Sequence, residues 1–213
     1  MKTKKSKPGI KVETDIKFKY ELIGVGCSKA YLKIGNAEVI FSGISWLCLP
    51  ITDLLMGLMS MIDEWDIIST HGEDIEITNN DAIFTWEDEP GGYTWKLERY
   101  GKRNLRISIK SLYDDENRKL QYNKIILDKV VDFKAFLAVI LKQTDLLVKE
   151  YGLLGFRKNW VSSSEGWRQF PLSHFLELKH YLLYNKILYI NIEGKTDNWS
   201  LKKELCLLEA EIK

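Results

Sequence analysis

The fold is decided by residues 73–112, EDIEITNNDAIFTWEDEPGGYTWKLERYGKRNLRISIKSL. Apolar and polar side chains alternate in four short runs, which is the period of strands with one buried face. Turn residues separate the runs at 79–81, at 89–92 and at Gly101, because Pro presets φ and Gly accepts a positive φ. The segment predicts a four-stranded antiparallel meander at about 73–112.

Strands and a helix are expected before this segment. Residues 16–25 (IKFKYELIGV) alternate in the same way, and shorter runs over 30–34 and 37–44 complete a three-stranded antiparallel opening. Pro50 begins a helix predicted at about 51–65, because the leucine and methionine side chains that follow fall on one broad face.

Two longer helices are expected in the second half of the chain. Asp132 is the predicted N-cap of a helix at about 132–151, which Gly152 ends, and Pro171 opens a helix at about 171–184. The side of the first helix opposite its apolar stripe carries Lys134, Lys142, Asp145 and Lys149. In the second helix, Lys179 joins the apolar side by its aliphatic stem.

Further elements are predicted around these helices. Residues 120–127 and 187–192 indicate strands, and leucines at helical spacing follow a cap at Asp197 or Asn198. A strand that pairs with 187–192 is the alternative for this C-terminal segment. Strands followed by helices, twice over, predict the α+β class rather than a wound parallel sheet. Antiparallel sheets are expected to pack against helices at about 51–65, 132–151 and 171–184.

The composition is that of a globular protein. The 213 residues include 31 Lys and Arg, 30 Asp and Glu, and 45% hydrophobic residues. These values exclude wholesale disorder and a uniformly basic nucleic-acid binder. We predict a flexible basic tail at 1–10 and one α+β domain at 11–213, with a sub-boundary near 113–118 as the alternative.

Cysteine usage and hydropathy predict a cytoplasmic protein. Cys27, Cys48 and Cys206 are widely spaced and form no CxxC, so neither a disulfide framework nor a zinc site is expected. No apolar stretch follows the basic N-terminus, and the apolar run 46–62 contains Pro50 and Asp53, which favours a buried helix over a membrane span. No cofactor fingerprint is present, and no cofactor is predicted.

The net charge of +1 conceals a division along the chain. Residues 1–33 carry net +6, residues 34–95 carry twelve acids with no Lys or Arg, and residues 96–213 carry net +7. Two interpretations stay open. The acidic strand 73–89 could form ion pairs with the basic strand 93–110, or the acids could form an exposed patch that attracts a basic partner.

The second interpretation gives the predicted partner-binding residues, which are acids in three clusters and one neighbouring aromatic residue. They are Asp63, Glu64, Asp66, Glu73, Asp74, Glu87, Asp88, Glu89 and Trp86. The absence of catalytic motifs favours a non-catalytic module that binds a protein partner through acidic loops and exposed aromatic residues.

Two alternative functions remain at this point. Tyr93, Trp95 and Tyr100 interleave with six cations over 93–110, a pattern that suits single-stranded nucleic acid. The other alternative is an enzyme whose site is assembled from scattered His, Cys and acidic residues, although the three histidines match no metal-binding motif.

Two segments, WEDEPGGYTW at 86–95 and FPLSHFL at 170–176, give a resemblance to known proteins. The chain resembles small uncharacterised bacterial proteins of the polymorphic-toxin immunity type. The resemblance covers 17 residues and contains no catalytic signature. It implies a cytoplasmic, single-domain, non-catalytic binder that neutralises a toxin domain, and it transfers no site residues. From the hydropathy of the chain, no membrane partner is expected.

Overall fold

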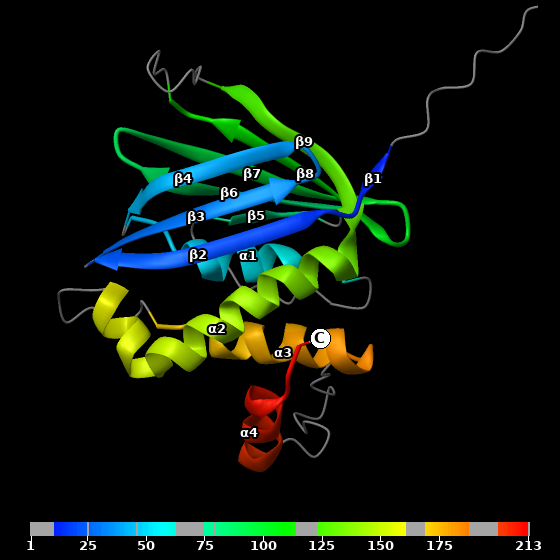
Figure 1. The fold of residues 1–213 in the computed structure, drawn as a ribbon. Helices are drawn as coiled ribbons and strands as arrows, with labels where there is room; N and C mark the ends of the chain where they lie inside the picture. The colour runs from blue at the N-terminus through cyan, green and yellow to red at the C-terminus, as the bar shows by residue number, and fades with distance from the viewer. Residues whose placement is uncertain are drawn as a thin grey trace, which may run out of the picture.

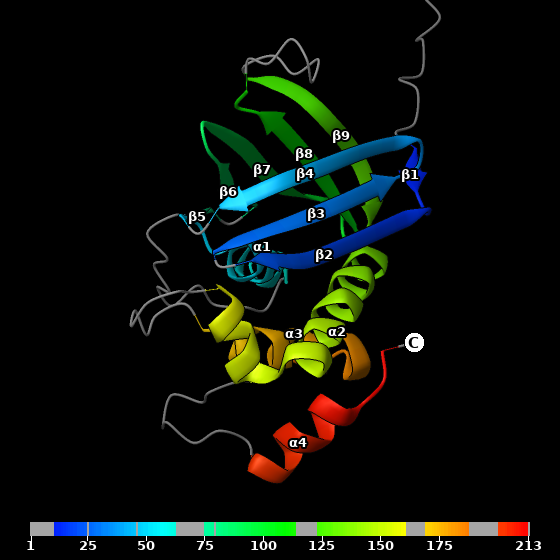
Figure 2. The same cartoon turned by 60° about the vertical axis from the view of Figure 1, so that its left-hand side comes forward.

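The fold was analysed in a computed structural model of the chain (Figure 1). The residues that it describes are 11–24, 26–45, 47–62, 75–78, 80–113, 123–160, 169–187 and 200–212. Two β-sheets lie on one side of the molecule, and helices pack against them from the other side (Figures 1 and 2). The predicted α+β class is confirmed.

The smaller sheet consists of β2 (Ile16–Gly24), β3 (Cys27–Ile34) and β4 (Ala37–Ser45), in that order. Both pairings are antiparallel, which confirms the predicted three-stranded opening. Alternation of buried and exposed residues along β2 places Phe18 and Tyr20 in the core and lysines on the outer face.

The larger sheet has six strands in the order β1-β9-β8-β7-β6-β5. Their bounds are β1 (Val12–Glu13), β5 (Ile75–Ile77), β6 (Asp81–Asp88), β7 (Gly91–Tyr100), β8 (Asn104–Ser111) and β9 (Lys124–Asp132). Neighbours from β5 to β9 are antiparallel, whereas β1 is parallel to β9. The segment expected to form a meander thus belongs to a larger sheet. The strand expected over 120–127 begins at Lys124 and continues to Asp132.

The two sheets face each other across an aromatic core. The ring of Phe41 on β4 lies 5.0 Å from that of Trp86, 4.8 Å from that of Tyr93 and 5.4 Å from that of Trp95. All four side chains are at most 2% exposed. Such ring pairs add about 0.5–1.5 kcal/mol each beyond the burial of their area, so this contact fixes how the sheets stack.

Four helices complete the described structure: α1 (Pro50–Met59), α2 (Phe133–Trp160), α3 (Leu172–Tyr184) and α4 (Leu201–Glu209). Helix α1 lies so close to the larger sheet that a Cβ on Gly57 would be 3.1 Å from side-chain atoms of Leu97 and Phe84. The helix predicted at about 51–65 ends at Met59, where a turn follows, and residues 63–65 lie outside the described residues.

The predicted helix ends are largely correct. Gly152 has φ 62° and ψ 174°, so regular helix stops there as expected, and a further helical segment completes α2. Helix α3 follows Pro171. Helix α4 excludes the strand alternative for the C-terminus, and its N-cap is Ser200 rather than Asp197 or Asn198. Of the strand predicted at 187–192, residues 188–192 lie outside the described residues.

Candidate functional site between β2 and α2

Strand β2 is an edge strand of the smaller sheet. Among the described residues its one strand neighbour is β3, with Tyr20 opposite Ala30 and Leu22 opposite Ser28. In an antiparallel pair the N–H and C=O groups of one residue point to the same side, and successive residues alternate. The Tyr20 carbonyl accepts a hydrogen bond from Gln143 of α2, so the backbone groups of Tyr20 and Leu22 face α2 rather than β3.

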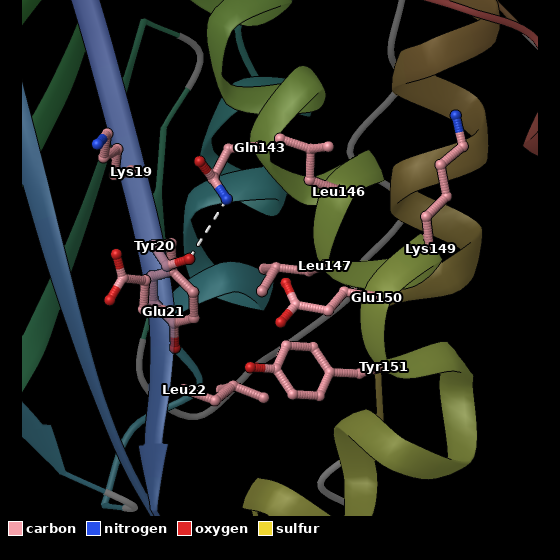
Figure 3. A pocket seen from close by; sticks show the side chains of 10 residues that line it. All are labelled: Lys19, Tyr20, Glu21, Leu22, Gln143, Leu146, Leu147, Lys149, Glu150 and Tyr151. Carbon is pink, nitrogen blue, oxygen red and sulfur yellow. Dashed lines mark hydrogen bonds between the residues drawn. The ribbon is translucent and has the colours of Figure 1, made fainter.

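Helix α2 runs beside this edge. It begins after Asp132, whose Oδ1 accepts the backbone N–H of Ala135 at 3.0 Å. In Figures 1 and 2, α2 and β2 diverge toward the C-terminal end of the strand. The Gly152 kink then turns the chain away from the first helical axis. The Gln143 side chain covers the edge of β2 at Tyr20, and the ring of Tyr151 extends toward Leu22 (Figure 3).

The space between the two elements is a groove of about 690 Å³. Gln143 Nε2 lies 3.3 Å from the Tyr20 carbonyl oxygen and bridges the groove (Figure 3). The described residues that line it are Lys19, Tyr20, Glu21 and Leu22 of β2, and Gln143, Leu146, Leu147, Lys149, Glu150 and Tyr151 of α2. These ten include no Cys, His or Ser.

The groove has an apolar floor and an exposed apolar rim. Leu147 is 2% exposed and extends the core, and Leu22 packs against it. Leu146 beside the groove is 57% exposed, and Ile23 at the end of β2 is 49% exposed. Aliphatic side chains left in water beside a buried floor are the usual composition of a binding cleft.

The charged residues that line the groove point in different directions. Glu150 is directed toward β2, whereas Glu21 points away from α2 and Lys149 lies on the side of the helix remote from the strand (Figure 3). Lys29 hydrogen-bonds Glu21 at 2.7 Å and lowers the pKa of that carboxyl. Lys19 also points away from α2, so among these four charged lining residues Glu150 alone is directed between the two elements (Figure 3).

The pKa of the Tyr151 phenol reflects the same environment. Partial burial raises the pKa of Tyr151, and the neighbouring Glu150 and Glu21 carboxylates raise it further. Its ring extends toward Leu22 across the groove (Figure 3). The site thus combines backbone hydrogen-bonding groups, aliphatic surface, one phenol and one carboxylate directed into the groove, which suits recognition of a polypeptide segment.

The sequence prediction placed the partner-binding residues elsewhere. Asp63, Glu64, Asp66, Glu73 and Asp74 lie outside the described residues. Glu87, Asp88 and Glu89 lie around the β6–β7 turn, in the larger sheet. Among these three, Glu89 alone is exposed.

The prediction that Trp86 faces a partner is wrong. Its side chain is fully buried, and its indole N–H donates to the Pro50 carbonyl at 3.2 Å. The reason is the register of β6, which puts Trp86 on the face that meets Phe41 and α1. Asp88 is also withdrawn, at 8% exposure, with its carboxylate against the backbone of Gly43.

Burial of the aromatic side chains also argues against the nucleic-acid alternative at 93–110. Tyr93 and Trp95 are core residues and cannot stack on bases from this position. Internal ion pairing is seen for Lys96, which lies 2.9 Å from Asp81 of the acidic segment. Arg106, however, pairs with Asp128 of β9, outside that segment.

The residues considered for an enzyme are dispersed. Cys27 is half-buried, Cys48 buried and Cys206 exposed on α4. His180 makes a hydrogen bond with the Lys186 carbonyl at 2.9 Å. Within the described ranges no group of three or more His, Cys, Asp or Glu could hold a metal ion.

The β2–α2 groove was not predicted from the sequence. Its strand and its helix were both expected, but their contact joins residues more than a hundred positions apart. The signal that could have indicated the site is polar Gln143 within the inward stripe of α2, together with an edge strand.

Comparisons with protein-family models, with curated proteins and with solved structures found no match. In the part of the chain that the structure describes, no helix is both long enough and apolar enough to cross a membrane.

Proposed function

We propose that the protein is a binding module for a protein partner, and that the partner occupies the groove between β2 and α2. The main support for this proposal is the edge of β2. Its backbone groups at Tyr20 and Leu22 face a groove with an exposed leucine on its rim. A strand edge beside apolar surface is a recurrent way for proteins to bind polypeptides.

The acidic segment 34–95 extends this proposal. Its exposed members, such as Glu89, would steer a basic partner toward the molecule and speed encounter at low salt. The resemblance to immunity-type proteins supports a toxin domain as the class of partner and the cytoplasm as the place of action.

Site-specific photocrosslinking tests the proposal. A photoreactive amino acid replaces Leu146 on the groove rim in one variant and Leu201 in the other. Leu201 is 70% exposed on α4 and serves as the matched control. Adducts formed in native lysate are identified by mass spectrometry, and each identified protein is then purified and titrated against the unmodified chain.

The decisive result is the titration. We expect a protein that crosslinks at position 146, binds the purified chain, and loses affinity when Leu146→Asp is introduced, while Leu201→Asp leaves the affinity unchanged. Equal affinity of the two aspartate variants for every crosslinked protein would overturn the groove as the binding site.

A further inference from the structure

We infer that the groove receives an extended segment of the partner as an added strand on β2, with a Lys or Arg of that segment against Glu150. This inference rests on the proposed function and specifies the conformation and the chemistry of the bound segment.

The backbone argument starts from Gln143. Its amide N–H donates to the Tyr20 carbonyl from the groove side, at 3.3 Å, where the N–H of an incoming strand would donate. Two residues further along β2, Leu22 directs its N–H and C=O to the same side, next to the ring of Tyr151. Two residues of β2 are therefore oriented to pair with an added strand.

The side-chain argument concerns the residues of the segment that point to the same face of the sheet as Leu22. These recur at every second position, because successive side chains of a strand point to opposite faces. One of them would lie against the aliphatic surface of Leu147 and Leu22, and the next would reach Glu150. Glu150 is exposed and directed into the groove, so it favours a cation. The segment thus carries an aliphatic residue and a Lys or Arg two positions apart.

A displayed library of random peptides of about ten residues, the upper length of ordinary strands, is the probe for selection on the full chain. We expect the selected sequences to share an aliphatic residue and a Lys or Arg two positions away. Affinity of a synthetic selected peptide should fall at least about tenfold in Glu150→Lys, because the reversed charge repels the cation. The control Glu209→Lys makes the same charge change at an exposed site on α4 and should leave the affinity within about twofold.

Amide hydrogen exchange reports the added strand directly. When the peptide is bound, the Leu22 amide should exchange more slowly, because its N–H gains a partner. The Glu21 amide already faces β3 and should be unchanged. Gln143→Ala should bind the peptide more tightly than the unmodified chain, since the Tyr20 carbonyl is then open to the added strand.

The outcomes separate this inference from the proposed function. Peptide that binds and is sensitive to Leu146→Asp, but leaves Leu22 exchange unchanged, would overturn strand addition and keep the binding module. Selection of peptides without a cation would overturn the role of Glu150. If selection yields no peptide and no purified protein distinguishes Leu146→Asp from Leu201→Asp, both proposals fail. A dimer in sedimentation that Leu146→Asp abolishes would identify the occupant as a second copy and overturn the inference.

Discussion

Lys179 Nζ lies 2.7 Å from Asp145 Oδ1, and the lysine side chain is fully buried. The same ammonium donates to the Leu208 carbonyl at 3.1 Å and lies 5.3 Å from the centre of the Phe175 ring. A single side chain on α3 therefore connects α2 with the C-terminal end of the α4 segment.

Replacing Lys179 should destabilise the protein strongly. We expect Lys179→Met to lower the free energy of unfolding by about 2 kcal/mol, because Asp145 then loses its buried partner and keeps only the half-exposed Lys149, at 2.6 Å. Adding Asp145→Leu should recover most of the loss, because removing both charges also removes the desolvation cost. Urea unfolding measures both. Lys142→Met, at an exposed position of α2, is the control and should change stability by at most about 0.5 kcal/mol.

Ionisation of Tyr20 should couple to unfolding at high pH. Burial raises the pKa of Tyr20 well above 10.0; Ser28 lowers it by a smaller amount, and Cys48 and Asp53 each add a still smaller increase. The folded state therefore holds this proton where the unfolded chain releases it. Stability from this group is complete below about pH 10 and is lost as the pH rises further, by up to about 1.4 kcal/mol per pH unit.

Tyr20→Phe should remove that part of the alkaline pH dependence. The slope of unfolding free energy against pH above about pH 10 should fall by close to one proton. Tyr184→Phe is a matched control, because the Tyr184 side chain is 58% exposed. A slope that is identical in Tyr20→Phe and the unmodified chain would contradict the assignment.

Asp128 should contribute stability that is lost in acid. Arg106 donates two hydrogen bonds to its carboxylate, at 2.8 and 2.7 Å, and lowers the pKa of Asp128 below 3.8. Because the folded pKa is depressed, the contribution is present above the unfolded pKa and disappears as the pH falls through the folded one. Arg106→Gln should cost about 0.5–1 kcal/mol near neutral pH, since both groups are partly exposed, and almost nothing in strong acid.

The measurement is urea unfolding at both pH values, together with an NMR titration of the Asp128 carboxyl. Its pKa should rise in Arg106→Gln. Lys110→Gln, at an exposed position on the same strand, should leave that pKa close to its original value. An unchanged Asp128 titration in Arg106→Gln would refute the pairing.

The three thiols should react in the order of their exposure. Cys206 is exposed on α4, Cys27 is half-buried, and Cys48 is 3% exposed. A thiol-specific disulfide reagent should modify Cys206 first and reach Cys48 only on unfolding. Cys206→Ser should remove the fastest phase, and addition of denaturant should release the Cys48 phase. A fast phase that survives in Cys206→Ser would contradict this order.

Local sequence patterns predicted where strands and helices form, but not what surrounds each of them in the folded protein. Alternation identified β2, and Gly152 marked the end of regular helix, because both signals lie within a few consecutive residues. Alternation also groups Trp86 with its inward neighbours, but it does not say whether that face meets a core or a partner. Only the contact with Phe41, 45 positions earlier, decides the question.

Helix α2 shows the same limit. The sequence places Asp145 opposite the apolar stripe, yet it is 7% exposed because α3 covers that side. Lys179 was expected to bury its stem, and the structure buries the charged end as well. The groove could not be inferred for the same reason, because β2 and α2 meet only in the folded chain.

The position of α2 beside β2 has a consequence for how copies of the protein behave together. An uncovered strand edge is a template on which identical chains pair and polymerise. Here the Gln143 amide donates a hydrogen bond to the Tyr20 carbonyl, and lysine side chains lie on the outer face of the strand. Loosening of α2 would uncover this template, so we expect the helix that shapes the groove also to limit pairing between copies of the protein.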